Sequence, residues 1–261
     1  MARACGYRRV PPAPAAAQGG RSAVTAATGR HEPALVAVPG LLLDQRLWER
    51  QTPLLGHDRE VQVPLLRRHA SIAAMAHAVL AEAPERFALC GLSMGGIVAL
   101  EIVRAAPERV TRLALLDTQA RADTAESTAG RREMLDLAQR RGFEPVIEQL
   151  LPRLVHPRLR DDAPTRRLLH EMAETIGLEG FEAQQEALIG RIDQRPNLPA
   201  IACPTLVLCG RQDALTPVDR HEEMAAAIPD ATLVVLPECG HLSPLERPDM
   251  VTAQLRAWLD G

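Results

Sequence analysis

The sequence around Ser93 places a reactive residue in a local pattern that would expose it. Ser93 stands in a Gly-Leu-Ser-Met-Gly run at positions 91–95, after the apolar residues 87–90 and before residues 97–103. This order predicts a strand, a tight turn and a helix, and Gly-x-Ser-x-Gly in that setting is typical of a serine nucleophile. The glycines suit a sharp turn, because side chains there would collide with the strand or the helix. The alternative is a glycine-rich turn whose serine only caps the helix.

Two loops near the carboxyl end of the chain offer a base and an acid for this serine. A serine hydroxyl is a weak nucleophile unless a histidine lies within hydrogen-bonding distance and a carboxylate orients that histidine. His241 follows an apolar run that ends at Leu236, and Asp213 follows another that ends at Cys209. We therefore expect Ser93, Asp213 and His241 to be the catalytic residues.

Other carboxylates and histidines compete for these roles. Asp117 directly follows the predicted strand 110–116 and would reach the same edge of a sheet, so it is a rival for the acid. Asp213 is favoured because its loop has the fuller motif. The remaining histidines fall in the N-terminal segment, in connecting loops or in helices, where a solvated or capping role is expected. They are His31, His57, His69, His77, His156, His170 and His221.

Two backbone N–H groups are candidates for stabilising the negative oxygen that forms when a serine attacks a carbonyl. The first belongs to Met94, directly after the serine, and the second to Leu41, after a turn that Gly40 permits. Bulky uncharged side chains near these positions are expected to line a substrate pocket. They are Leu42, Leu215 and Leu242.

These residues can act together only if the fold brings their loops close to one another. Along the chain, apolar runs alternate with helical segments. The alternation predicts an α/β fold with a mainly parallel central sheet flanked by helices. Predicted strands are 34–38, 87–90, 110–116, 204–209 and 232–236, and predicted helices include 71–83 and 249–259. Between about 119 and 196 the alternation stops, and four charged segments predict a helical insertion: 122–141, 145–155, 164–176 and 179–192. Their interspersed arginines and carboxylates are typical of a solvated surface.

From residue 33 to residue 259 the chain resembles an α/β-hydrolase fold enzyme. The resemblance rests on the turn at 91–96, the Gly-Arg-Gln-Asp turn at 210–213, the Gly-His-Leu turn at 240–242 and the Pro-Gly loop at 39–40. The order serine, aspartate, histidine is also that of the superfamily. It implies one domain over residues 32–261, with the insertion at about 119–196 as a helical lid. Relatives often have His-Gly where this chain has Pro-Gly, so only a backbone role is expected of that loop.

Within the superfamily the chain is similar to small bacterial carboxylesterases. This implies a serine hydrolase that cleaves esters of small to medium acyl chains through an acyl-enzyme intermediate. Enol-lactones and carrier-protein methyl esters are alternative substrates, because the chain also resembles 3-oxoadipate enol-lactonases and pimeloyl-carrier-protein methyl ester esterases. Ser93 argues against dehalogenases and epoxide hydrolases, whose nucleophile is an aspartate. A non-catalytic ligand receptor with the same fold is an alternative of another class.

The net charge and the length of the apolar runs exclude some classes of binding partner. The 261-residue chain has a formal net charge of -3 and lacks the basic balance that nucleic acid binding requires. Its apolar runs fall short of the roughly 18 residues of a membrane span, so a small-molecule ester is the expected partner, with no nucleic acid and no membrane. The oligomeric state is left open by the sequence.

The cysteines and the N-terminal residues complete the sequence-based picture. Five cysteines without metal-type spacing are expected to be reduced and buried, which indicates a cytoplasmic protein. The sequence signals no metal and no organic cofactor. Residues 1–31 are rich in Ala, Arg, Pro and Gly and are expected to form a disordered extension.

Overall fold

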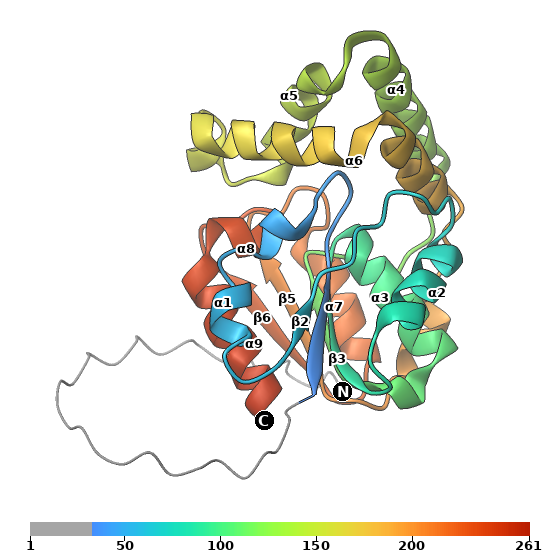
Figure 1. Cartoon of the computed structure of the whole chain (residues 1–261), viewed down its shortest axis with the longest axis vertical. Helices are drawn as coiled ribbons and strands as arrows, with labels where there is room; N and C mark the ends of the chain where they lie inside the picture. The colour runs from blue at the N-terminus through green and yellow to red at the C-terminus, as the bar shows by residue number, and fades with distance from the viewer. Residues whose placement is uncertain (1–32) are drawn as a thin grey trace, which may run out of the picture.

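A computed structural model of the chain describes residues 33–261, and the extension expected at residues 1–31 lies outside the described part. The described residues build a six-stranded sheet in which paired strands are parallel, in the order β2-β1-β3-β4-β5-β6 (Figure 1). The strands are β1 (Ala34–Val38), β2 (Val61–Gln62), β3 (Phe87–Leu92), β4 (Val110–Leu116), β5 (Thr205–Gly210) and β6 (Ala231–Leu236). The predicted α/β class with a mainly parallel sheet is confirmed.

Helices connect the strands and extend beyond them. The α-helices are α1 (Thr52–Leu55), α2 (Ile72–Glu82), α3 (Met94–Ala105), α4 (Ala125–Arg141), α5 (Phe143–Leu154), α6 (Ala163–Ile189), α7 (Val218–Ala227), α8 (Ser243–Glu246) and α9 (Pro248–Asp260). Short 3-10 helices are η1 (Gln45–Trp48), η2 (Pro107–Arg109), η3 (Pro157–Leu159) and η4 (Arg195–Ala200). None of the helices among residues 33–261 has both the length and the apolar character that a membrane crossing needs.

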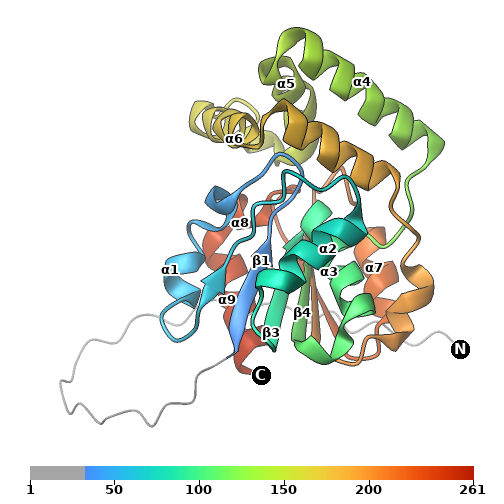
Figure 2. The same cartoon turned by 45° about the vertical axis from the view of Figure 1, so that its right-hand side comes forward.

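The two faces of the sheet are covered by different helices (Figure 2). In β3, Phe87 and Leu89 belong to the core formed with α2, α3 and α7, whereas Ala88 and Cys90 belong to the core formed with α1 and α9. Because both faces are buried, a central parallel strand is apolar at every position rather than at alternate positions. The strand β2 was not predicted, since two residues are too short to give a recognisable pattern.

The helices α4, α5 and α6 lie together beyond the carboxyl ends of the strands (Figures 1 and 2). We call these three helices the cap. Their bounds agree with the four helical segments predicted between 119 and 196, except that the last two are joined in α6. Gly177 has a φ of 72° inside α6, so the helical geometry is interrupted between the segments 164–176 and 179–192. Glycine adopts this conformation without the steric penalty of a side chain.

Candidate active site

Ser93 lies on a sharp turn between β3 and α3, with a φ of 55° that is unusual for a residue with a side chain. The close packing of the turn explains its glycines. A Cβ atom at Gly95 would lie 2.1 Å from the carbonyl oxygen of Val38, and one at Gly91 would lie 2.3 Å from that of Gly95. The turn is also tied to β4, because Ser93 N donates to the carbonyl oxygen of Leu116 at 3.0 Å. The backbone strain is therefore held by tight surroundings.

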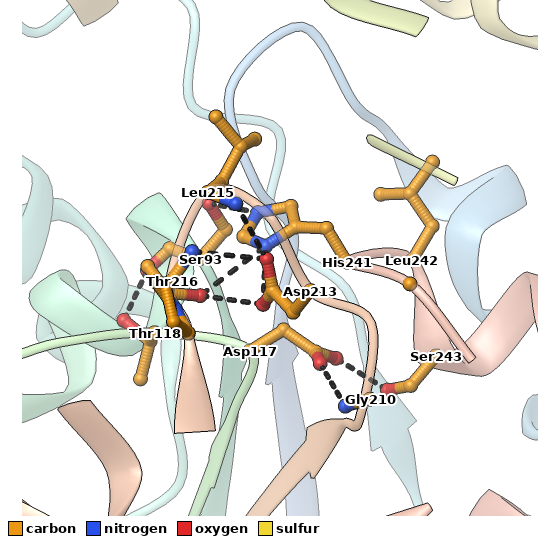
Figure 3. A network of polar contacts seen from close by, with 12 residues as sticks. Ser93, Asp117, Thr118, Gly210, Asp213, Leu215, Thr216, His241, Leu242 and Ser243 are labelled. Carbon is orange, nitrogen blue, oxygen red and sulfur yellow. Dashed lines mark hydrogen bonds and ion pairs between the residues drawn. The ribbon is translucent and has the colours of Figure 1, made fainter. Parts of the chain in front are cut away.

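Three side chains that the sequence predicts together form a continuous hydrogen-bonded series (Figure 3). Ser93 Oγ lies 2.8 Å from His241 Nε2, and His241 Nδ1 lies 2.8 Å from Asp213 Oδ2. Ser93 follows β3, Asp213 follows β5 and His241 follows β6. Parallel strands end at the same edge of a sheet, so the three loops meet there. The imidazole and the carboxylate are almost completely buried.

The loop after β5 holds the carboxylate of Asp213 from both sides. Its Oδ1 accepts hydrogen bonds from the backbone N–H groups of Leu215 and Thr216, at 2.8 and 2.9 Å, and its Oδ2 accepts from Thr216 Oγ1 at 2.6 Å. Burial by itself raises the pKa of Asp213, but the nearby charge of His241 and these hydrogen bonds lower it below its usual value. Asp213 is thus held in its charged form.

The same pair sets the protonation of His241. Burial favours the neutral imidazole, but the charge of Asp213 and the hydrogen bond to it outweigh burial, so the pKa of His241 lies above its ordinary value. A histidine bonded to a carboxylate through Nδ1 presents Nε2 to its other neighbour. Here that neighbour is the hydroxyl of Ser93, so the arrangement is suited to removing the proton of the serine.

Asp117, the rival acid, occupies a different place at the end of β4. It is fully buried, its Oδ1 accepts from Gly210 N at 2.9 Å and its Oδ2 accepts from the hydroxyl of Ser243. Within residues 33–261 it forms no hydrogen bond with His241. Burial and the neighbouring charge of Asp213 raise the pKa of Asp117 well above its ordinary value. Asp117 therefore joins the ends of β4 and β5 to the start of α8, and Asp213 contacts the imidazole.

The backbone N–H groups of Leu41 and Met94 border the same site. Neither donates a hydrogen bond to another residue in the described part of the chain. The N–H of the next residue, Leu42, is occupied, since it donates to Gln184 Oε1 at 3.0 Å. Leu42 has a φ of 59°, which turns the chain sharply after β1. Two unpaired donors thus flank Ser93, as expected for an anionic oxygen that binds there.

A cavity of about 660 Å³ opens at Ser93 and His241. The three leucines predicted for the substrate pocket, Leu42, Leu215 and Leu242, all line this cavity. Leu41 and Met94 line it as well. Apolar side chains of all three cap helices complete the wall, namely Met134, Ile147, Leu150, Leu154 and Leu169. The cap therefore contributes an aliphatic surface to the cavity, and charged side chains of the cap line the cavity as well.

Charged residues in and beside the cap show that one sequence-based prediction was wrong. The arginines of residues 119–196 were expected to lie on a solvated surface, but Arg131 and Arg191 line the cavity and their side chains are only 17% and 4% exposed. Both pair with Asp123, whose side chain is 2% exposed. Composition could not reveal this, because Arg191 comes from a different segment than Asp123 and Arg131.

The prediction for His221 was also wrong, since a solvated or capping role was expected for this histidine. It is completely buried in α7, where its Nε2 accepts a hydrogen bond from Thr118 N at 2.9 Å. Thr118 Oγ1 in turn donates to the carbonyl oxygen of Ser93 at 2.7 Å. Burial lowers the pKa of His221 to about 4. His221 is thus a neutral acceptor that helps to fix the turn of Ser93, a role for which helix periodicity gives no signal.

The cysteines of the described residues are free thiols. Cys90, Cys209 and Cys239 are buried free thiols, whereas Cys203 is half-buried rather than buried as expected. Among residues 33–261, no group of three or more His, Cys, Asp or Glu side chains is arranged to hold a metal ion.

Comparison with known proteins places this geometry in a family. Residues 35–254 match the model of the Alpha/beta hydrolase family. The chain belongs to this family. Because the match covers most of the described residues, the chain is an α/β hydrolase with the fold of that family, and its relatives support a function of the esterase type.

Several relatives of this α/β hydrolase cleave esters or lactones. It is 30% identical over 241 residues to the pimeloyl-acyl-carrier-protein methyl ester esterase of Aromatoleum aromaticum. The aligned region covers 84% of this chain and 95% of that protein. A thermophilic esterase from Thermogutta terrifontis, solved with malate bound, is 33% identical with a TM-score of 0.78, covering 87% of this chain and 89% of that one. The enol-lactonase from Burkholderia xenovorans is 26% identical with a TM-score of 0.80, covering 89% and 94%.

Proposed function

We propose that this α/β hydrolase is a carboxylesterase that cleaves esters of small to medium acyl chains through a serine-bound intermediate. The observation that carries the proposal is the series of 2.8 Å contacts from Ser93 Oγ through His241 to Asp213. Nucleophile, base and orienting acid are the three parts that serine catalysis requires. The aliphatic side chains that line part of the cavity at the serine support an acyl chain as the group that binds.

The first half of the proposed reaction forms the acyl-enzyme. Ser93 Oγ attacks the ester carbonyl while His241 Nε2 takes the serine proton, and Asp213 stabilises the imidazolium that results. The carbonyl oxygen becomes negative and binds the N–H groups of Leu41 and Met94, which have no other acceptor in the described structure. Collapse of the intermediate breaks the ester bond, and His241 gives its proton to the leaving alcohol.

The second half releases the acid. His241 removes a proton from a water molecule, whose oxygen attacks the acyl group on Ser93. The same two N–H groups hold the negative oxygen, and the proton returns to Ser93 Oγ as the carboxylic acid leaves. These steps use only the protein and water, so the proposed reaction requires no cofactor.

We also propose that the cap acts as a lid over this site within a single domain at 32–261. Side chains from α4, α5 and α6 and side chains from the loops after the strands line one cavity, so substrate that reaches Ser93 is enclosed by both. Movement of the cap would then control which substrates enter.

Enol-lactone or carrier-protein methyl ester cleavage is the second candidate. It is favoured by the named activities of the Burkholderia xenovorans and Aromatoleum aromaticum proteins. Opening a lactone uses the same steps, except that the leaving oxygen remains attached to the acyl group. The candidates differ in the substrate and share the proposed chemistry.

Hydrolysis of p-nitrophenyl esters of graded acyl length tests the proposed function. We expect turnover of short and medium chains, and a loss of about 10⁴-fold or more in kcat for Ser93→Ala. Ser127→Ala is a matched control, because Ser127 is exposed and lines the same cavity. Full activity of Ser93→Ala would refute the mechanism. A wild-type protein that cleaves none of the esters would favour a ligand receptor.

A further inference from the structure

A buried charged cluster borders the cavity where α4 begins and α6 ends. Arg191, two residues after the end of α6, places Nη1 2.7 Å from Asp123 Oδ1, and Arg131 of α4 places Nε 3.3 Å from Asp123 Oδ2. Both arginines line the cavity that contains Ser93 and His241. The proposed ester chemistry does not use either of them.

The charges of this cluster do not balance. Two guanidinium groups share the single carboxylate of Asp123, which leaves one net positive charge in nearly buried surroundings. Burial lowers the pKa of Arg131 and Arg191, and the attraction of Asp123 does not restore it. A buried charge that lacks a full partner is destabilising, so an anion that binds here gains more than at an exposed arginine.

Three other charged residues line the cavity, and all three are exposed: Glu126, Glu133 and Arg153. None of their side chains forms an ion pair or hydrogen bond with another described residue. Water screens exposed charges strongly, so these residues affect a bound anion less than the buried pair does.

Several donors of the cluster have no acceptor within residues 33–261. Arg131 bonds through Nε to Asp123 and through Nη1 to Gln185 Oε1 at 2.9 Å, but its Nη2 bonds to no described residue. Arg191 donates to backbone carbonyls through Nε and Nη1, and its Nη2 is likewise without a described acceptor. Gln185 Nε2 is buried without a hydrogen-bond partner beside them. The guanidinium groups are thus fixed by some of their nitrogens while others remain available.

We propose that Arg131 and Arg191 form a carboxylate-binding subsite, so that the preferred substrates are esters whose acyl chain ends in a carboxylate. The proposal rests on the proposed esterase function and specifies its substrate class. Paired planar N–H groups suit a carboxylate, and one net positive charge matches a single negative charge better than a doubly charged phosphate. Aliphatic side chains such as Leu150 and Leu169 line the same cavity and suit a methylene chain.

The chain connectivity limits how far the subsite lies from the nucleophile. Thr118 Oγ1 donates to the carbonyl oxygen of Ser93, and Asp123 follows five residues later. Five residues span at most about 18 Å when fully extended. Ser93, Arg131 and Arg191 also line one cavity, and the series of ester lengths in the test determines which acyl chain connects the nucleophile with the subsite.

The test compares monomethyl esters of dicarboxylic acids, from glutarate to suberate, with methyl esters of uncharged acids of the same chain length. We expect the wild-type kcat/KM to favour the best carboxylated ester by roughly 10- to 100-fold. Arg131→Gln should abolish most of this ratio. Arg132→Gln is the matched control and should keep it, because Arg132 is exposed on the same helix and does not line the cavity.

Competitive inhibition of the wild type supplies a second measurement that does not depend on the folding of a variant. Adipate should inhibit hydrolysis of p-nitrophenyl acetate at roughly tenfold lower concentration than the uncharged 1,6-hexanediol. A wild-type enzyme that cleaves uncharged esters as well as carboxylated ones, or that keeps its preference in Arg131→Gln, overturns the subsite and leaves the esterase function standing. If no ester is cleaved, the proposed esterase function fails, and calorimetric titration with adipate still tests the subsite. Absence of adipate binding in that titration would overturn the carboxylate-binding subsite.

Discussion

Replacing Asp213 by asparagine distinguishes the two carboxylates at the end of the sheet. In the structure, Asp213 Oδ1 accepts from the backbone N–H groups of Leu215 and Thr216. An asparagine oxygen would keep this place, and its Nδ2 would then face Nδ1 of His241. Because an amide nitrogen donates, the imidazole would have to accept at Nδ1 and carry its proton on Nε2. It could then no longer take the proton of Ser93.

The size of the effect follows from this change of tautomer. The corresponding substitution in a serine protease lowers kcat by about 10⁴-fold, equivalent to about 5 kcal/mol of transition-state stabilisation. We expect a loss of this order for Asp213→Asn. The pH profile should also change. Asp213 raises the pKa of His241 and the neutral imidazole is the active form, so the acid limb of the remaining activity should move to lower pH.

Asp117→Asn is the matched control. The raised pKa of Asp117 favours an uncharged carboxyl group, and asparagine can accept from Gly210 N and donate to the hydroxyl of Ser243 in the same place. This variant should retain most of its activity. Steady-state kinetics of both variants on one p-nitrophenyl ester between pH 5 and 9 provide the measurement. A severe loss in Asp117→Asn with little change in Asp213→Asn would refute the assignment of the acid.

Further predictions concern the surroundings of the nucleophile. His221→Leu removes the acceptor of Thr118 N and leaves a buried N–H without a partner. We expect the free energy of unfolding, measured by urea denaturation at pH 7, to fall by about 1–3 kcal/mol. His221→Gln should lose less. Because burial lowers the pKa of His221 from 6.5 to about 4, protons favour the unfolded chain as the pH falls below 6.5. The wild type should therefore lose about 3 kcal/mol through this group by pH 4, and His221→Gln should lack this loss; equal pH dependence of the two would contradict it. Gly95→Ala, whose Cβ would lie 2.1 Å from Val38 O, should lose folded protein or activity, whereas Gly130→Ala has open space and should raise the unfolding free energy by up to about 1 kcal/mol. An active and stable Gly95→Ala protein would contradict the packing of the turn.

The sequence was informative where function depends on local pattern and strand order. Ser93, Asp213 and His241 each follow an apolar run, and parallel strands bring such loops to one edge. Their meeting in space was therefore predictable without coordinates. The helical segments of the cap were also predictable, because long charged stretches without apolar strand runs favour helices. The strand β2 was not, since two residues carry no pattern.

Other features depend on partners that are distant in sequence. The buried pairing of Arg191 with Asp123 joins two segments that are far apart in the sequence, and local composition around either residue indicates only a charged helix. His221 lies on a helix whose periodicity does not identify Thr118 as its partner. Such contacts arise from tertiary packing, and this is why the sequence predicted the reacting residues more completely than the residues that support them or contact the substrate.

Labelling with a fluorophosphonate probe tests the central claim most directly. An activated serine attacks such a probe and keeps the phosphonyl group, whereas an ordinary surface serine does not react. Peptide mapping by mass spectrometry should find the adduct on Ser93 in the wild type and no adduct in Ser93→Ala. Wild-type protein that cleaves esters but carries no adduct on Ser93 would contradict the account.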